Sequence, residues 1–398
     1  MATNREREKD REEEEENERE RVRVARAACG NEQGERSVAN DQVGDLWHLT
    51  YLGLRGTRIK CLPSSLQNLH NLETLDVRDT LIKFLPSSIT NIKKLRHLLL
   101  RNMKIHGSDV LVMMPSGIDN LRHLQTLSGL KADIYSLELA HLTQLKKLYV
   151  SITGQEEART LFAAINQIAN LHSLKIGCRD RHGKYTELML ETLLPLPQYL
   201  EKLTLGANIM ELPLWFAHFK SLRVLVLVNS MLVFDPLSNL SGLPNLVSLS
   251  LFHAYTGEQM GCRQGGFPKL RHLHITSFIE LGEWTPIEEG TMPCTQFIRI
   301  VDCGKLSMLP QGFEQLRTLE SLELIEMSQE FIRKLVEEDF YKVHHISKVI
   351  ALPRISCERN LLDSENLQLK IHESSGASSS SSPFVEATRK RKLGNQTG

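Results

Sequence analysis

The chain contains one histidine pair and one glycine-bounded stretch whose spacing suggests metal or nucleotide chemistry. His272 and His274 would lie on one face of a strand, as a metal pair requires, but no third ligand is evident. The stretch 177–185 has one residue too many for a phosphate-binding loop, and Tyr185 stands where that motif has Ser or Thr. The sequence has no HExxH, GxSxG or Rossmann glycine pattern. We therefore predict that the chain is not an enzyme and binds no metal or cofactor.

Three arginines, Arg55, Arg78 and Arg101, recur at an interval of 23 residues. If each interval is one repeat of a stacked structure, the guanidinium groups would form a column with a spacing of about 4.8 Å, the distance between neighbouring strands. Like charges at that spacing repel each other, so an acidic partner would stabilise the column. The alternative is that Asp76 and Asp79 neutralise the arginines and that the remaining charge is solvated.

A second candidate surface is apolar. Val224, Val226 and Val228 alternate along one predicted strand and would all point outward, with Phe252 in the next repeat. Exposed apolar patches often mark contacts with other molecules. The alternatives are that the valines reflect the β-propensity of an interior strand, or that the register is inverted. The complete set of predicted partner-binding residues adds the three arginines and two further outward positions: Tyr51, Arg55, Arg78, His97, Arg101, Val224, Val226, Val228 and Phe252.

These residues belong to a sequence repeat that must position them. The segments that begin at Leu49 and Leu72 both read LxxLxLxxTxIxxLP, where x is any residue. The pattern returns at intervals of 21 to 29 residues and is weakest from Leu124 to Leu171. A recurring length of this kind is typical of solenoid proteins. The twelve repeat starts are Leu49, Leu72, Leu95, Leu124, Leu145, Leu171, Leu200, Leu222, Leu246, Leu270, Thr295 and Leu319.

Each repeat predicts a short strand, a turn and an irregular convex segment. In the first repeat, Leu52 and Leu54 would point to one face, and Tyr51 and Arg55 to the other. The small polar residue eight positions after a repeat start, such as Thr57, can hydrogen-bond the backbone where the chain turns. One repeat buries too little apolar surface to be stable alone, but stacked repeats share a leucine core. We therefore predict an α/β solenoid, a leucine-rich-repeat horseshoe with parallel concave strands and about twelve repeats.

Composition divides the chain into four regions. Residues 1–36 form a charged, low-complexity tail that we expect to be disordered. Residues 37–350 form the solenoid with terminal caps, in which Val43, Leu46 and Trp47 cover the first repeat and an amphipathic stripe from Phe331 to Val343 covers the last. Residues 351–371 form a short ordered extension, and residues 372–398 form a Ser-rich and basic disordered tail. The run Arg389, Lys390, Arg391 and Lys392 matches a nuclear-import signal.

The composition also bears on the class of protein. The 398 residues include 48 basic and 48 acidic side chains, and this zero net charge removes a global electrostatic argument for nucleic-acid binding. No run of about 18 apolar residues is present, and the N-terminus has no apolar signal-peptide core. The seven cysteines are scattered without a CxxC pair, which favours reduced thiols. We therefore expect a cytoplasmic protein without a membrane span, or a nuclear one if the basic run directs import.

Three stretches of the repeats have sequences that are more specific than the LxxLxL pattern alone. They begin with Tyr-Leu-Gly-Leu-Arg-Gly-Thr at residues 51–57, with Ala-Tyr-Thr-Gly-Glu at 254–258, and with Glu-Glu-Gly-Thr-Met-Pro at 288–293. This wording resembles the leucine-rich repeat region of plant intracellular nucleotide-binding disease-resistance proteins of the coiled-coil class. The likeness covers about residues 41–350, and the repeats carry LPxx(I/L) instead of the GxIP form of plant extracellular repeats.

The resemblance implies non-catalytic protein recognition in plant defence, or innate immunity. The partner would be a pathogen effector, a guarded host protein or a nucleotide-binding domain, and the family's early repeats usually pack against such a domain. The family's motifs GxxxxGK[ST] and Met-His-Asp do not occur here, so we do not carry over ATP or ADP binding. We expect a repeat-only relative, a truncated gene product or an incomplete gene model. The alternative function is a general signalling scaffold of the type associated with small GTPases.

Overall fold

The computed structural model describes residues 41–100, 102–103, 109–110, 112–132, 134–180, 182–193, 196–197 and 199–354. The chain divides into two compact units, of which the first ends at Leu200 and the second begins at Glu201. The predicted tails at 1–36 and 372–398, and all but residues 351–354 of the predicted extension, lie outside the described residues.

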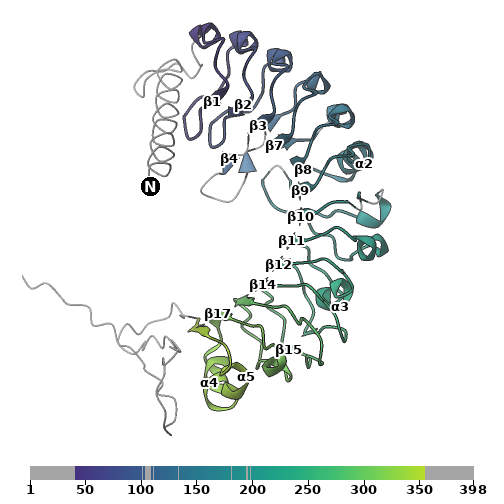
Figure 1. Cartoon of the computed structure of the whole chain (residues 1–398), viewed down its shortest axis with the longest axis vertical. Coiled ribbons are helices and arrows are strands. Elements are labelled where there is room, and N and C mark those ends of the chain that lie inside the picture. The colour runs from purple at the N-terminus through teal and green to yellow at the C-terminus, as the bar shows by residue number, and fades with distance from the viewer. Residues whose placement is uncertain are drawn as a thin grey trace, which may run out of the picture. The chain divides into compact units, whose positions relative to one another are not determined.

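The first unit is built on short strands on one side and helical turns on the other (Figure 1). Neighbouring strands in the sheet follow chain order and are parallel: β1 (Tyr51–Gly53), β2 (Thr74–Asp76), β3 (His97–Leu99), β7 (Thr126–Lys131), β8 (Lys147–Ile152) and β9 (Ser173–Cys178). Strand β6 (Val112–Met113) also pairs with β7, and β4 (Asn102–Met103) pairs with β5 (Asp109–Val110) in antiparallel orientation. The helical segments are the 3-10 helices η1 (Asp41–Asp45), η2 (Ser64–Asn68), η3 (Ser87–Asn91), η4 (Ile118–Asn120), η5 (Ile134–His141) and η6 (Leu190–Thr192), and the α-helix α2 (Gln155–Ile165).

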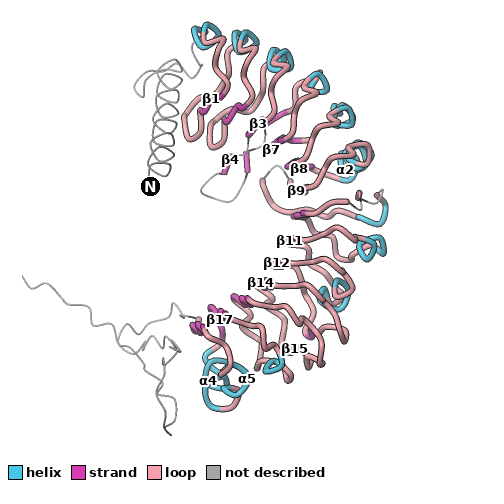
Figure 2. The backbone as a smooth tube through the Cα atoms, in the orientation of Figure 1, coloured by secondary structure: helices cyan, strands magenta, loops and turns pink. Residues whose placement is uncertain are grey.

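The second unit has the same organisation (Figure 2). Its parallel strands are β10 (Lys202–Gly206), β11 (Val224–Val228), β12 (Ser248–Phe252), β14 (His272–Thr276), β16 (Phe297–Val301), β17 (Ser321–Met327) and β18 (Lys348–Pro353). On the side away from them, β13 (Gln259–Met260) pairs with β15 (Glu283–Trp284). The helical segments are η7 (Leu214–His218), α3 (Pro236–Leu240), η8 (Phe313–Gln315), α4 (Gln329–Glu337) and α5 (Phe340–Val343). We call the strand side of each unit its concave face.

Each of the twelve predicted repeat starts is followed two residues later by a strand, so the leucine-rich-repeat solenoid is confirmed. The structure adds one strand that the sequence pattern did not reveal. Strand β18 follows Ile346 by two residues and pairs with β17 in parallel. Its inward positions are Val349 and Ala351, and the alanine replaces the leucine that marks the other repeats.

The leucine positions form the core of each unit. Leu52 and Leu54 in the first repeat are fully buried, as are Leu66 and Leu69 from the convex segment. Each fully buried leucine contributes about 1.5–3 kcal/mol of transfer free energy. Pro63 caps η2 with an extended backbone (φ −73°). Proline fits there because it lacks the N–H that a helix start leaves unpaired.

The predicted turn bonds are present in the first two repeats. The hydroxyl of Thr57 donates to the carbonyl of Leu54 at 2.7 Å, and that of Thr80 donates to the carbonyl of Val77 at 2.8 Å. At the equivalent Asn208, the buried Oδ1 atom has no hydrogen-bond partner among the described residues. In the first two repeats, the hydroxyl of this small polar residue therefore stabilises the turn after the strand.

Five strands of the second unit, β11, β12, β14, β16 and β17, share a left-handed residue directly after their member of the outward row that begins at Val228. The angle φ is 53° at Asn229, 48° at His253, 56° at Ser277, 54° at Asp302 and 58° at Glu326. Such values are uncommon for residues with a Cβ atom and carry a strain of about 1–2 kcal/mol. Backbone hydrogen bonds to the next strand hold the first four, for example from the N–H of Asn229 to the carbonyl of Phe252 at 2.8 Å.

The amphipathic stripe from Phe331 to Val343 forms α4 and α5, which lie between β17 and β18 in the chain. Phe331 and Leu335 are buried, as the stripe predicts. Lys342 of α5 is also completely buried, which the sequence did not indicate. In the described part of the chain, no helix has both the length and the apolar character that a membrane span requires.

Candidate partner-binding surface

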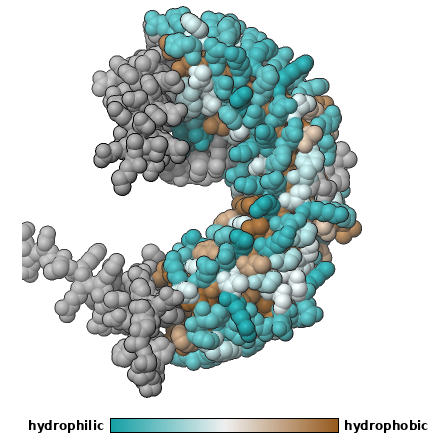
Figure 3. Space-filling model, in the orientation of Figure 1, coloured by the Kyte–Doolittle hydropathy of each residue, from teal (hydrophilic) through white to brown (hydrophobic). Residues whose placement is uncertain are grey.

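The outward side chains of the concave strands form the candidate surface. In β11, Leu225 and Leu227 are buried, whereas Val224, Val226 and Val228 are half-buried and face outward. The inverted register considered above is therefore wrong. In Figure 3, hydrophobic residues, drawn in brown, reach the surface in the part of the molecule where Figure 1 places strands β11 to β17.

The sheet register connects Val228 and Phe252 into a longer row. Val228 is the register partner of Phe252, and each following strand contributes the next member, all half-buried. We call this set the apolar row: Val228, Phe252, Thr276, Val301, Ile325 and Leu352. Val224 and Val226 do not extend in this way, because their partners on β12 are Ser248 and Ser250. The apolar surface thus runs across the strands instead of along β11.

A polar row lies next to the apolar row on the same face. His274, Arg299 and Glu323 are consecutive register partners on β14, β16 and β17. Glu323 forms ion pairs with Arg299 at 3.5 Å and with Lys348 at 3.9 Å. The ring of His274 makes an edge contact with Phe252, with ring centroids 4.7 Å apart. Burial lowers the pKa of His274, and the positive charge of Arg299 lowers it further.

The two described arginines of the predicted column are paired with carboxylates. Arg78 donates two side-chain hydrogen bonds to Asp76, at 2.8 Å and 2.5 Å, and this bonding raises the pKa of Arg78. The Nε atom of Arg55 donates to Oδ2 of Asp79 at 3.0 Å, although the Arg55 side chain is 60% exposed. The geometry at these two positions therefore follows the alternative in which Asp76 and Asp79 neutralise the arginines. Arg101 lies outside the described residues.

Tyr51 and His97 lie on the concave face of the first unit. Thr74 is the register partner of both, so one strand separates the two side chains. Both are half-buried, and burial lowers the pKa of His97, with a further contribution from Arg96. An added Cβ atom at Gly53 would lie 2.8 Å from the Tyr51 ring, so this ring covers the glycine. The valines of β11 belong to the second unit.

The histidine pair and the glycine-bounded stretch were the two sequence features that suggested metal or nucleotide chemistry. His272 and His274 both face outward from β14, and no group of three or more His, Cys, Asp or Glu side chains among the described residues has metal-binding geometry. In the stretch 177–185, Oδ1 of Asp180 accepts hydrogen bonds from the backbone N–H groups of His182 and Lys184 at 2.8 Å and 2.9 Å. These N–H groups therefore point at the chain's own carboxylate.

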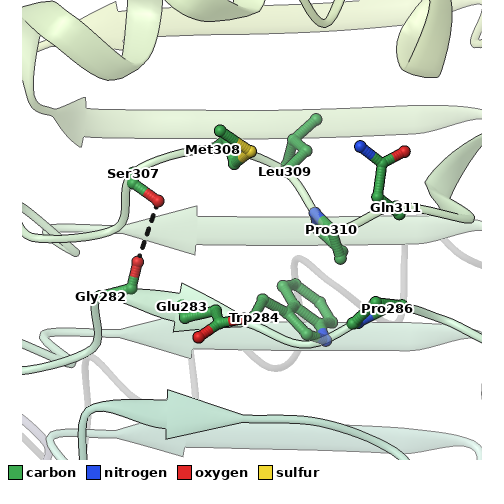
Figure 4. Close-up of a pocket in the computed structure, with 9 residues that line it drawn as sticks. All are labelled: Gly282, Glu283, Trp284, Pro286, Ser307, Met308, Leu309, Pro310 and Gln311. Atoms are coloured by element: carbon green, nitrogen blue, oxygen red, sulfur yellow. Dashed lines mark hydrogen bonds between the residues drawn. The ribbon is translucent and has the colours of Figure 1, made fainter.

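One open hollow of about 410 Å³ lies in the lateral segments of the second unit (Figure 4). Trp284 lies beside Pro286 and Pro310 in this hollow, and the hydroxyl of Ser307 donates to the carbonyl of Gly282 at 3.2 Å. Its lining is mixed, since Glu283 and Gln311 accompany the apolar side chains of Met308 and Leu309. No residue of the apolar row or the polar row lines this hollow, and we assign it no role.

The stacked parallel strands and the outward side chains define the protein as a leucine-rich-repeat protein with an extended concave surface. It belongs to the family described as "Leucine-rich repeat region", whose model matches residues 21–301. Solved structures share this fold: the leucine-rich-repeat protein LIC12759 of Leptospira interrogans superposes with a TM-score of 0.50 at 19% identity, covering 79% of this chain and 81% of that one.

The curated relatives are plant disease resistance proteins. Probable disease resistance RPP8-like protein 4 and disease resistance protein RPP8, both of Arabidopsis thaliana, are each 31% identical to this chain, over 316 and 310 residues respectively. Each match covers 77% of this chain and 34% of the relative, so the chain spans about a third of the length of these proteins. The predicted likeness to the repeat region of plant disease resistance proteins is confirmed.

Proposed function

We propose that this module recognises a protein partner through its concave strands during plant defence, without catalysing a reaction. The observation that carries the proposal is the alternation in strands such as β11, where buried leucines fix the backbone and half-buried side chains face outward. Repeat solenoids use such extended concave surfaces for binding. The relatives named as disease resistance proteins support the role in defence.

We propose three classes of partner: a pathogen effector, a guarded host protein, or a nucleotide-binding domain, whether in the same longer protein or in another chain. For the nucleotide-binding domain, the first unit is the better candidate, because exposed charge remains at Arg55. Its ion pair with Asp79 is exposed, and exposed pairs contribute only about 0–1 kcal/mol, so an incoming carboxylate can replace Asp79 at little cost.

We further propose that the module acts in the cytoplasm. The disease resistance relatives support this placement, since the repeat wording resembles the intracellular class of these proteins. The basic run 389–392, which matches an import signal, lies outside the described residues. Imaging of a fluorescent fusion in leaf cells, with and without substitution of this run, tests the compartment.

The proposal is tested with outward substitutions on the concave face and a matched control on the convex side. Val226→Asp and Val228→Asp place a charge on the face without disturbing Leu225 or Leu227. Leu214→Asp in η7 is the control, because this side chain is 91% exposed and lies on the opposite side of the unit. Proximity labelling in pathogen-challenged leaves should recover a reproducible partner with the wild type and with the control, but not with the valine variants.

Two results would contradict the proposal. One is a partner that is lost with Leu214→Asp and retained with both valine variants. The other is partner recovery that is limited to small GTPases or phosphatases and independent of infection, which would favour the general scaffold. Circular dichroism of each purified variant shows whether the repeats remain folded.

A further inference from the structure

We propose that the concave face of the second unit binds one amphipathic α-helix of its partner, laid across the strands on the apolar row. Basic side chains of that helix would face Glu326. This inference rests on the proposed function and specifies the chemistry of the partner.

The apolar row is continuous over six strands. Five of its six members are Val, Ile, Leu or Phe, and Thr276 contributes a methyl group at the remaining position. All six side chains are half-buried by their neighbours, so each presents an ordered apolar surface. A row of this kind provides an apolar surface on which the apolar face of a helix can pack.

The spacing of the row suits a helix better than an extended peptide. Six strands separated by about 4.8 Å place the ends of the row about 24 Å apart. A helix of about 16 residues covers this length, and its apolar stripe recurs once per turn, about every 5.4 Å. An extended chain presents side chains to one face only about every 6.7 Å, so over five intervals it would fall about 10 Å out of step. The helix accumulates a mismatch of only about 3 Å.

Carboxylates beside the apolar row favour basic side chains on the bound helix. Asp302 directly follows Val301, and Glu326 directly follows Ile325 in the chain. Oδ2 of Asp302 accepts a hydrogen bond from Ser277 at 3.0 Å. Its Oδ1 atom is buried without a hydrogen bond among the described residues and forms an ion pair with the guanidinium of Arg354 at 3.6 Å. Glu326 is exposed.

The other flank of the row carries compensated charge. The carboxylate of Glu323 already has two basic partners, Arg299 and Lys348. On the opposite flank, Asp302 is paired with Arg354, whereas the exposed Glu326 forms no ion pair among the described residues, so the negative charge available to a ligand is that of Glu326. A helix with Lys or Arg on one edge of its apolar stripe complements both the row and this flank.

The probe for this proposal is a display library of random 18-residue peptides, selected on the full chain and counter-selected on the Ile325→Asp variant. We expect enriched peptides with apolar residues at i, i+3, i+4 and i+7 and with Lys or Arg beside them. A synthetic copy of an enriched peptide should become helical on binding, as measured by circular dichroism. Its affinity is then measured on single variants by fluorescence anisotropy.

The variants come in matched pairs. Phe252→Asp and Ser248→Asp lie on the same strand, and both positions face outward and are half-buried. We expect Phe252→Asp to weaken binding by at least about tenfold, as for a central interface residue, and Ser248→Asp to leave it within about twofold. Glu326→Gln should weaken binding about threefold at low salt and have less effect at high salt.

Three outcomes would overturn the proposal. The library could enrich peptides whose apolar residues alternate with period two, or it could enrich acidic helices. It could also fail to enrich any peptide whose binding is lost with Ile325→Asp. Thermal unfolding identifies a variant that has lost its fold, and Phe252→Asp replaces Ile325→Asp in the counter-selection if that occurs. If these experiments fail while Val226→Asp and Val228→Asp still abolish partner recovery in leaves, the helix proposal is wrong and the proposed function stands.

Discussion

Lys342 of α5 is fully buried, and its Nζ atom lies 2.8 Å from Oδ1 of Asp339. The same ammonium group donates a hydrogen bond to the carbonyl oxygen of Leu309 at 2.7 Å, in the preceding repeat. A buried charge is tolerated only when such partners compensate the loss of water. This pair therefore holds the helical segment of the last repeat against its neighbour.

Removing one partner of this pair should destabilise the second unit strongly. Lys342→Met leaves the Asp339 carboxylate buried, and the loss of a single partner in a buried pair costs about 3–5 kcal/mol. Urea unfolding followed by far-ultraviolet circular dichroism measures this change in the free energy of unfolding.

Two further variants identify the origin of that loss. Arg333→Met removes exposed ion pairs with Glu330 and Glu337 in α4 and should leave the urea midpoint almost unchanged. The double variant Lys342→Met with Asp339→Leu should recover most of the stability, because no charge remains buried. If Lys342→Met is as mild as Arg333→Met, the buried pair has no structural role.

Two glycines with the same backbone conformation should respond differently to alanine. Gly290 and Gly312 both have φ of 81°, so alanine at either position is strained by about 1–2 kcal/mol. A Cβ atom at Gly290 meets nothing within 4 Å, whereas at Gly312 it would lie 2.0 Å from the carbonyl oxygen of Ile287. Gly312→Ala should therefore lower the thermal midpoint clearly more than Gly290→Ala. Equal losses in differential scanning calorimetry would show that the backbone near Ile287 moves away freely.

The lowered pKa of His274 predicts loss of stability at mildly acidic pH. Burial favours its neutral form, so below about pH 6.5 the unfolded chain binds a proton more readily than the folded protein does. Stability is complete above the unfolded pKa and falls as the pH drops toward the folded value. His274→Gln should reduce the slope of unfolding free energy against pH in this window.

The control for this prediction is Ser250→Ala, which removes no titratable group from a half-buried outward position of the neighbouring strand β12. It should retain the slope of the wild type. His97→Gln in the first unit should also reduce the slope, because burial lowers the pKa of His97 in the same direction. An unchanged slope in both the His97 and His274 variants would contradict the assignment.

The described cysteines should separate into reactive and inert thiols. Burial raises the pKa of Cys262 and of Cys303 to about 12, so almost no thiolate exists at neutral pH. Cys61 and Cys294 are exposed. Iodoacetamide at pH 7.5 should therefore label Cys61 and Cys294 in the native protein, and label Cys262 and Cys303 only after unfolding. Rapid native labelling of Cys303, detected by mass spectrometry, would contradict the burial of its repeat.

The strands could be predicted from the sequence because the spacing of the leucines determines which residues face the core. Two inward leucines separated by one residue form a strand, and the repeat length places the next strand beside it. Strand β18 was missed because Ala351 is too small to mark an inward position and because the preceding helical stripe interrupts the pattern. The burial of Lys342 also could not be predicted, since it depends on a carbonyl in another repeat.

The apolar row crosses several strands, whereas the sequence prediction placed the apolar surface along one strand. Val224, Val226 and Val228 share a strand, but register partners across strands share a surface. The signal was available in the repeat itself: every member of the apolar row lies six positions after its repeat start, the same position that holds Arg55 and Arg78 in the first unit. Comparing that position across repeats would have identified Val301 and Ile325.

The left-handed residue at the end of five strands of the second unit bears on how the binding surface can evolve. The backbone path at Asn229, His253, Ser277, Asp302 and Glu326 is nearly the same although the side chains differ in size and charge. At the first four of these positions, a main-chain bond to the adjacent strand maintains the conformation, and any amino acid except proline can make this bond. Substitution at these rim positions can therefore alter ligand preference one repeat at a time, while the leucine scaffold that carries them stays constant.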